Sequence, residues 1–229
     1  MGKRGPKPKR GEVAWSPELA YAVGLITTDG SLSKNGRCID LTSKDCEQLV
    51  TFLKCIGRPD ISIGIKKNSQ GTPITRVQVG DITLYNFLLS IGLMPNKTKK
   101  VGPLAIPEKY LFDFLRGHYD GDGSFYSYYD PRWKSSFMFY LSFVSASPAH
   151  IAWIREELLH KLKVKGHITT AIGSCVLQLK YGKKETIEIL KRLYPNPEVV
   201  CLSRKRLKIE HALRIVGKSL PAARKNLAK

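Results

Sequence analysis

The chain has 229 residues, 42% of them hydrophobic, which is enough for one large domain or for two units of about 100 residues with cores of their own. Thirty-eight Lys and Arg against nineteen Asp and Glu give a net charge of +19, which indicates a polyanionic partner and favours nucleic acid over a merely soluble basic protein. No run reaches the ~18 apolar residues of a membrane span, and no apolar segment follows the basic N-terminus as in a signal peptide.

The cysteines are odd in number, lie far apart and include no C-x-x-C pair; they are Cys38, Cys46, Cys55, Cys175 and Cys201. This pattern argues against a zinc site and against a disulfide framework. We therefore expect an intracellular reducing compartment, which is the cytoplasm, the nucleoid or an organelle.

Residues 1–15 are predicted to form a basic arm that is disordered on its own. The first eleven residues hold five cationic side chains and two prolines, with Met1 as their one hydrophobe. Such an arm suits contact with phosphates or with a minor groove. A solubilising tail or a nuclear-type address fits the same composition.

Residues 16–100 are predicted to form a first α+β unit. Ser16-Pro17-Glu18 has the N-cap, the proline and the acidic first turn that open a helix, here over 18–28. Asn35-Gly36 predicts a hairpin turn between strands 31–34 and 37–43, with Leu32, Ile39 and Leu41 facing the core. A helix at 44–56, strands at 60–68 and 72–80 and a helix at 82–91 complete the unit. Strand 60–68 alternates Ile61, Ile63 and Ile65 with small or polar residues.

Residues 110–229 repeat this order after a linker at 101–109 that contains Pro103 and Pro107. A helix ending near Gly121 is followed by strands 124–130 and 136–145, a helix from Ser147-Pro148 to about 163, strands 166–172 and 174–181, a helix at 184–193 and a C-terminal helix. We therefore predict an α+β protein made of two αββαββα subdomains.

A short motif recurs at the start of both units. Gly24 is followed five residues later by Asp29-Gly30-Ser31, and Gly117 is followed five residues later by Asp122-Gly123-Ser124. Recurrence at domain-scale spacing indicates a duplicated unit. A glycine inside a helix lets two helix backbones approach closely, so packing through Gly24 and Gly117 would bring Asp29 and Asp122 together.

The segments 22–30 and 115–123 resemble the nonapeptide motif of the LAGLIDADG homing endonuclease family at the glycine and at the closing Asp-Gly, and the first segment also matches at Gly-Leu-Ile. The resemblance implies two pseudo-symmetric subdomains that pack through their motif helices and form a saddle of two antiparallel sheets. It also implies a single-chain monomer that cleaves DNA. In this family a basic residue after the third helix of each unit stands near the scissile phosphates, which carries that role onto Lys97 and Lys205. Generic phosphate-binding or solvated lysines are the alternative.

Two carboxylates side by side repel each other and attract divalent cations, and Mg²⁺ prefers oxygen ligands. Asp29 and Asp122 are therefore predicted as metal ligands, helped by the main-chain carbonyls of Thr28 and Gly121, with Mn²⁺ or Ca²⁺ as alternative occupants. The competing interpretation is that Asp-Gly only ends each helix.

Three residues of the second motif, Arg116, His118 and Tyr119, depart from the small or aliphatic family pattern. Asp120 has Thr27 as its counterpart in the first unit, so we expect it to bond at the helix end or behind the ligands rather than to act in catalysis. His118 is expected to be an interfacial or exposed histidine, because no His or Cys partners lie nearby in the sequence.

One face of each predicted sheet is polar, basic and aromatic, which suits base edges in a major groove, and two such sheets would cover on the order of 20 bp. The predicted DNA contacts of the first unit are Ser31, Ser33, Asn35, Arg37, Asp40, Thr42, Lys66, Arg76 and Gln78. Those of the second unit are Ser124, Tyr126, Tyr128, Tyr140, Ser142, Gln178 and Lys180. For the tyrosines, contact with thymine methyl groups competes with simply covering the sheet.

The leading hypothesis is a metal-dependent, site-specific endonuclease that cuts double-stranded DNA at a long pseudo-palindromic target. The alternative is a catalytically inactive binder, either a maturase whose partner is intron RNA or a DNA-binding regulator. Two acids beside basic clusters favour the enzyme, because a pure binder needs no acids near phosphates. A ribosome-associated protein would not carry paired Asp-Gly motifs. The absence of splice-junction residues favours an intron over an intein as the source.

Overall fold

Local capping sets where the helices of the first half begin. In the computed structural model, which describes residues 11–67, 71–170 and 173–222, the Ser16 hydroxyl accepts from the Leu19 N–H at 3.1 Å and Pro17 takes the first helical position. Asp45 and Asp81 cap the next two helices in the same way. Residues 1–10, which make up most of the predicted basic arm, lie outside the described residues.

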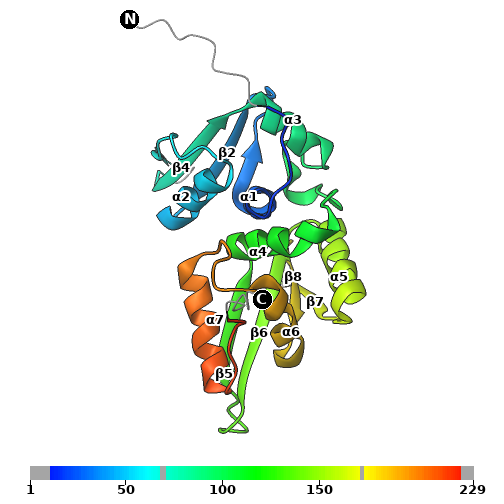
Figure 1. The fold of residues 1–229 in the computed structure, drawn as a ribbon. Coiled ribbons are helices and arrows are strands. Elements are labelled where there is room, and N and C mark those ends of the chain that lie inside the picture. The colour runs from blue at the N-terminus through cyan, green and yellow to red at the C-terminus, as the bar shows by residue number, and fades with distance from the viewer. Residues whose placement is uncertain (1–10, 68–70, 171–172, 223–229) are drawn as a thin grey trace, which may run out of the picture.

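Each half of the chain forms one sheet and its covering helices (Figure 1). The first half contains α1 (Pro17–Asp29), β1 (Gly30–Leu32), β2 (Cys38–Ser43), α2 (Cys46–Cys55), β3 (Gly64–Lys67), β4 (Pro73–Gly80), α3 (Ile82–Ser90) and the 3-10 turn η1 (Lys97–Lys99). The second half contains η2 (Glu108–Tyr110), α4 (Leu111–Gly121), β5 (Ser124–Tyr129), β6 (Phe137–Ser145), α5 (Pro148–Leu162), β7 (His167–Thr170), β8 (Leu177–Tyr181), α6 (Lys183–Leu193) and α7 (Ser203–Ile215).

All strand pairs are antiparallel, in the orders β1-β2-β4-β3 and β5-β6-β8-β7. Side chains alternate between the two faces of a strand, so one face of each sheet is buried beneath helices and the other is polar. The buried face carries Leu32, Ile39, Leu41, Val77 and Val79 in the first half and Phe139, Leu141 and Phe143 in the second. The predicted α+β architecture of two repeated αββαββα halves is therefore confirmed.

The predicted strand at 60–68 is wrong in its first part. Pro59 occupies the second position of a turn in which the Ile61 N–H donates to the Arg58 carbonyl at 3.3 Å, so β3 begins only at Gly64. Ile65 is 77% exposed because it lies opposite Thr75 on the outer strand of the sheet, on the same side as Val77 but beyond the cover of the helices.

The predicted strand at 174–181 is also too long. The Ser174 hydroxyl accepts from the Val176 N–H at 3.0 Å, and this local turn delays β8 until Leu177. The preceding strand, predicted over 166–172, covers His167–Thr170, and residues 171 and 172 lie outside the described residues. Among the described helices, none is both long and apolar enough to cross a membrane.

Candidate functional site

The two motif helices, α1 and α4, touch through their glycines at the junction of the halves (Figure 1). A Cβ atom added to Gly24 would stand 2.3 Å from the Phe114 carbonyl oxygen, and one added to Gly117 would stand 2.0 Å from the Tyr21 carbonyl oxygen. Real Cβ atoms do not approach backbone so closely, so any side chain at either position would push the helices apart. The backbones therefore cross in direct contact, and the two helix ends are held side by side.

Both motif acids lie at the end of this helix pair. A Cβ on Gly121, the last residue of α4, would stand 3.1 Å from Asp29 Oδ2 and would overlap the Thr28 side chain. Burial raises the pKa of Asp29, against the lowering effect of the Gln48 amide and of Lys205 and Lys97. Burial also raises the pKa of Asp122, and the neighbouring charge of Asp29 raises it further. Asp29 and Asp122 thus share one partly desolvated centre.

Both predicted catalytic lysines point into the same centre. Lys97 Nζ donates to the Thr28 carbonyl at 3.3 Å. Lys205 Nζ donates to the carbonyls of Tyr119 at 2.5 Å, Gly121 at 3.1 Å and Gly123 at 2.8 Å. Burial lowers the pKa of each ammonium group to about 8, although nearby carboxylates oppose the shift. Two acids and two lysines from four distant parts of the chain therefore meet at one place.

Gln48 belongs to this centre, although it lies in neither sequence motif. Its amide nitrogen donates to Asp29 Oδ2 at 2.5 Å, and its amide oxygen accepts from the Ser43 hydroxyl at 2.7 Å. Gln48 is buried in the first turn of α2, one turn before Phe52. A polar residue that extends the apolar stripe of a helix is the signal in the sequence that points to such a residue.

A second buried network lies just behind the acids. Asp120 Oδ2 accepts from the Tyr21 hydroxyl and from the Leu202 N–H, both at 2.8 Å, so it ties α1 to the residue that precedes α7. Burial raises the pKa of Asp120 to about 6, and these two donors oppose the rise. The arrangement agrees with the expected bonding role at the helix end, and it anchors the start of the helix that carries Lys205.

Arg116 and His118, which depart from the family pattern, are both buried in the core. The Arg116 guanidinium donates to the Val200 carbonyl at 2.7 Å and to the Leu193 carbonyl at 2.8 Å, so it holds the segment between α6 and α7. His118 is packed against His150, with ring centroids 5.2 Å apart and an angle of 25° between the rings. The expectation of an exposed His118 is wrong, because its ring is buried against rings of the second half, among them Phe143 and His150.

The oxygen donors of the centre fit a hydrated divalent cation. Among the described residues, no group of three or more His, Cys, Asp and Glu side chains could hold a metal ion, which leaves Asp29, Asp122 and main-chain carbonyls as protein ligands. Mg²⁺ accepts such a set because it is usually bound by one or two carboxylates and keeps several waters. The carbonyls of Thr28 and Gly121 already accept from the two lysines, and each has a second lone pair.

In the first half, the register brings most of the predicted DNA contacts onto one face of the sheet. Ser31 lies opposite Asp40, Asp40 opposite Gln78, and Thr42 opposite Arg76. Arg76 Nε donates to Asp40 Oδ1 at 2.8 Å, so these two side chains are paired with each other. Lys66 on β3 lies on the same face. Ser33, Asn35 and Arg37 lie in the exposed β1–β2 turn, where the Ser33 hydroxyl donates to Asn35 Oδ1 at 2.7 Å.

In the second half, all seven predicted contacts line one hollow of about 690 Å³ on the open face of the sheet; they are Ser124, Tyr126, Tyr128, Tyr140, Ser142, Gln178 and Lys180. His167, which no sequence pattern indicated, also lines the hollow and lies opposite Lys180. The rings of Tyr128 and Tyr140 are stacked with centroids 6.3 Å apart. The two sheet faces therefore differ, with an ion pair on the first and an aromatic cluster on the second.

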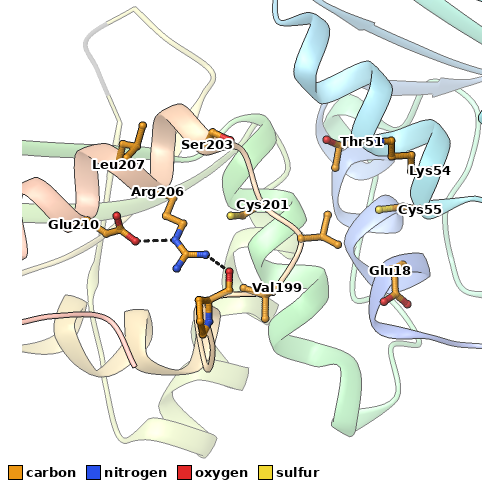
Figure 2. A pocket seen from close by; sticks show the side chains of 12 residues that line it. Glu18, Thr51, Lys54, Cys55, Val199, Cys201, Ser203, Arg206, Leu207 and Glu210 are labelled. Atoms are coloured by element: carbon orange, nitrogen blue, oxygen red, sulfur yellow. Dashed lines mark hydrogen bonds and ion pairs between the residues drawn. The ribbon is translucent and has the colours of Figure 1, made fainter. Parts of the chain in front are cut away.

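Another hollow, of about 640 Å³, lies at the seam between the halves (Figure 2). Its lining includes Glu18 in the first turn of α1, and Asp29 of the acid centre lies at the opposite end of the same helix. Figure 2 shows Arg206 on one wall bonded to Glu210, at 2.8 Å, and to the Pro197 carbonyl. None of its lining residues belongs to the predicted site, so this hollow is separate from the acid centre.

No protein-family model and no curated protein matches the chain. Solved structures do match it. Full-length DUF199/WhiA from Thermatoga maritima is 16% identical with a TM-score of 0.56, over 90% of this chain and 62% of that protein, so the chain spans less than two thirds of that relative. The homing endonuclease I-WcaI bound to its DNA recognition sequence is 15% identical with a TM-score of 0.58, over 85% of this chain and 88% of that one.

Variants of the homing endonuclease I-DmoI are 16% identical with a TM-score of 0.57, over 85% of this chain and 97% of theirs. I-DmoI in complex with DNA and Mn gives a TM-score of 0.50 at 16% identity, over 77% of this chain and 96% of that one. At these identities the likeness concerns the fold. This chain has the LAGLIDADG fold with two motif helices in a single chain, as found in homing endonucleases and in the LAGLIDADG domain of WhiA.

Proposed function

We propose that this protein is a site-specific endonuclease that binds double-stranded DNA across its two sheets and hydrolyses one phosphodiester in each strand. The observation that carries the proposal is the convergence of Asp29, Asp122, Lys97 and Lys205 at the ends of the paired motif helices. A protein that only bound DNA would gain nothing from two partly buried carboxylates beside the phosphates, because like charges repel.

The two open sheet faces would contact DNA on either side of the acid centre. Polar side chains at alternate positions of β2, β4, β6 and β8 suit hydrogen bonds to base edges in the major groove. The structures of I-WcaI and I-DmoI with DNA support this assignment for a chain of the same fold. Because both motif helices belong to one chain and cover each other, we also propose that the protein acts as a monomer.

Asp29, Asp122 and the carbonyls of Thr28 and Gly121 would hold Mg²⁺, or Mn²⁺ as in the I-DmoI complex with DNA and Mn. When bound, such ions lower the pKa of a water molecule and stabilise the charge on the leaving oxygen. Gln48 holds the Asp29 carboxylate in one orientation through its amide. The ammonium groups of Lys97 and Lys205 would stabilise the charge that develops on the phosphate oxygens.

The test is cleavage of a randomised duplex library by the purified protein with Mg²⁺, followed by sequencing of the cut ends. Asp29→Asn and Asp122→Asn should each abolish double-strand cleavage, by at least about a hundredfold, while DNA affinity stays near that of the wild type. Asp60→Asn is the matched control, because Asp60 lies in an exposed turn and is paired with Arg58. Cutting at the wild-type rate by both motif variants would rule out the assignment.

A binder without cleavage activity is the second candidate. It is favoured by the lysine contacts at the carbonyls of Thr28 and Gly121, which already occupy one lone pair of each proposed ligand. The fold shared with the LAGLIDADG domain of WhiA supports it as well. Tight binding of selected duplexes without cutting in Mg²⁺ or Mn²⁺ would favour this candidate. Competition by structured RNA in the same assay distinguishes an RNA partner from a DNA partner.

A further inference from the structure

The β5–β6 hairpin of the second half is longer than its counterpart in the first half. β1 pairs with β2 over three residues, whereas β5 pairs with β6 over six. At about 3.4 Å per residue, three extra pairs carry the tip of the hairpin about 10 Å further from the acid centre. Figure 1 shows this hairpin projecting beyond α6 and α7 at the end of the molecule away from α1.

The turn at this tip is ordered by its own hydrogen bonds. The Asp130 N–H donates to the Ser136 carbonyl at 2.9 Å, and the Trp133 N–H donates to the Asp130 carbonyl at 3.1 Å. The Ser136 N–H donates to the Trp133 carbonyl at 2.7 Å, and Asp130 Oδ1 accepts from the Arg132 N–H at 2.9 Å. These bonds therefore fix the turn without help from the Trp133 side chain.

Trp133 is nevertheless 70% exposed at the tip of this turn. An indole is the largest apolar side chain, and its exposure leaves unburied a large area that the fold does not use. Arg132 and the exposed Lys134 flank it, and the Arg132 side chain is 81% exposed although its guanidinium lies 3.4 Å from the Asp130 carboxylate. An aromatic ring between two cations matches a partner that offers apolar sugar surfaces between phosphates.

The first half provides a natural comparison. Its shorter turn has two cations, Lys34 and Arg37, but carries Asn35 and Gly36 between them instead of an aromatic residue. In the second half, Tyr126 and Tyr128 line the hollow and lie on β5 between the acid centre and the tip, so the hairpin that carries Trp133 is aromatic along its open face as well. The aromatic extension is thus specific to one half of the molecule.

We propose that Trp133, with Arg132 and Lys134, forms an outer DNA-binding site that contacts the duplex beyond the second half-site. Trp133 lies against the sugars and base edges in a groove, and the two cations contact the flanking phosphates. At 3.4 Å per base pair, the extra reach corresponds to about three base pairs, so the footprint on the target is asymmetric. This inference rests on the proposed binding of double-stranded DNA.

The test compares the wild type, Trp133→Ala and Trp133→Phe on a target selected by the wild type. We expect the wild-type footprint to extend about three base pairs further on the side of the second half than on the side of the first. Trp133→Ala should lose that extension and bind about tenfold more weakly, because the apolar area that the indole buries against the groove is removed. Trp133→Phe should restore the extension in part, and Lys34→Ala in the shorter turn should leave it unchanged.

Tryptophan fluorescence gives an independent measurement. DNA should quench the emission of the wild type more than that of Trp133→Phe, which retains Trp15 and Trp153 packed against other rings. Equal footprints and equal quenching in the wild type and the Trp133 variants, with tight DNA binding retained, would overturn this inference and leave the proposed function intact. A wild-type protein that binds no duplex DNA would overturn both.

Discussion

Asp120 is a buried residue that joins two elements far apart in the sequence. Its carboxylate is fully buried and accepts from Tyr21 on α1 and from Leu202 before α7. A buried charged acceptor that loses one of its donors destabilises the fold more than a neutral acceptor does. The Tyr21–Asp120 bond therefore stabilises the contact between the halves.

We expect Tyr21→Phe to lower the free energy of unfolding by about 1.5–3 kcal/mol, because the hydroxyl it removes donates to a carboxylate. Tyr85→Phe is the matched control, since the Tyr85 hydroxyl donates at 2.6 Å to the neutral Ser33 carbonyl, and it should cost about 1 kcal/mol. Urea unfolding at pH 8 measures both values. Equal losses for the two variants would contradict the charged character of the Asp120 bond.

The buried histidine pair predicts a loss of stability in acid. Burial lowers the pKa of His150 to about 4 and keeps the pKa of His118 well below its usual value, and the positive charge of Lys97 acts on both. In the unfolded chain histidine titrates near about 6.5, so the unfolded state binds more protons in this range. The histidine contribution is therefore complete above about pH 6.5 and is lost as the pH falls towards 4.

His150→Asn isolates this contribution, because its amide nitrogen can replace Nδ1, which lies 2.9 Å from the Gly102 carbonyl. The raised pKa values of Asp29, Asp120 and Asp122 stabilise the fold as the pH falls, but this effect is common to the wild type and the variant. Between pH 6.5 and 4, the free energy of unfolding should fall less in the variant than in the wild type. The difference should be up to about 1.4 kcal/mol for each unit by which the pKa of His150 is lowered in the fold. Identical slopes would show that His150 is not titrating in this range.

At the scale of elements, the crossing of α1 and α4 has no space for a side chain at either glycine. We expect Gly117→Ala to lower the free energy of unfolding by at least about 2 kcal/mol, even though alanine favours the helix by about 1 kcal/mol. Gly80→Ala is the control, because its added Cβ would meet nothing within 4 Å, and it should change stability by less than about 1 kcal/mol. A Gly117→Ala protein as stable as the wild type would mean that the helices do not cross at Gly117.

The element order and most helix ends could be predicted from the sequence, because caps and hydrophobic periodicity are local. Two strand boundaries were predicted wrongly because of local hydrogen bonds. The turn at Pro59 and the Ser174 hydroxyl bond each shortened a strand that alternation alone had extended. Alternation also does not tell where helix cover ends, which is why the exposure of Ile65 was not foreseen.

At the scale of the whole molecule, the charge of +19 and the basic side chains on both sheet faces predict DNA binding that depends strongly on salt. Six to ten phosphate contacts would lower affinity by roughly 10³ to 10⁵ between 50 and 200 mM salt. Lys180→Ala, on the open face of β8, should reduce the slope of log affinity against log salt by about one. Lys191→Ala, paired with Glu188 on α6, should not change it, and a flat response of the wild type would exclude binding through the sheets.

The sequence by itself determined the duplicated α+β order, the glycines at which the motif helices touch, and the place of Asp29 and Asp122 at the ends of those helices. These features follow from periodicity and from spacing within each motif. The tertiary structure alone decided that Gln48 holds Asp29, that His167 joins the second sheet face and that Asp120 joins Tyr21 to Leu202. The hydrogen-bonded partners are 19 to 99 positions apart in the chain, so no local sequence pattern predicts these contacts. Only the packing of one half on the other brings Tyr21 and Asp120 within hydrogen-bond distance.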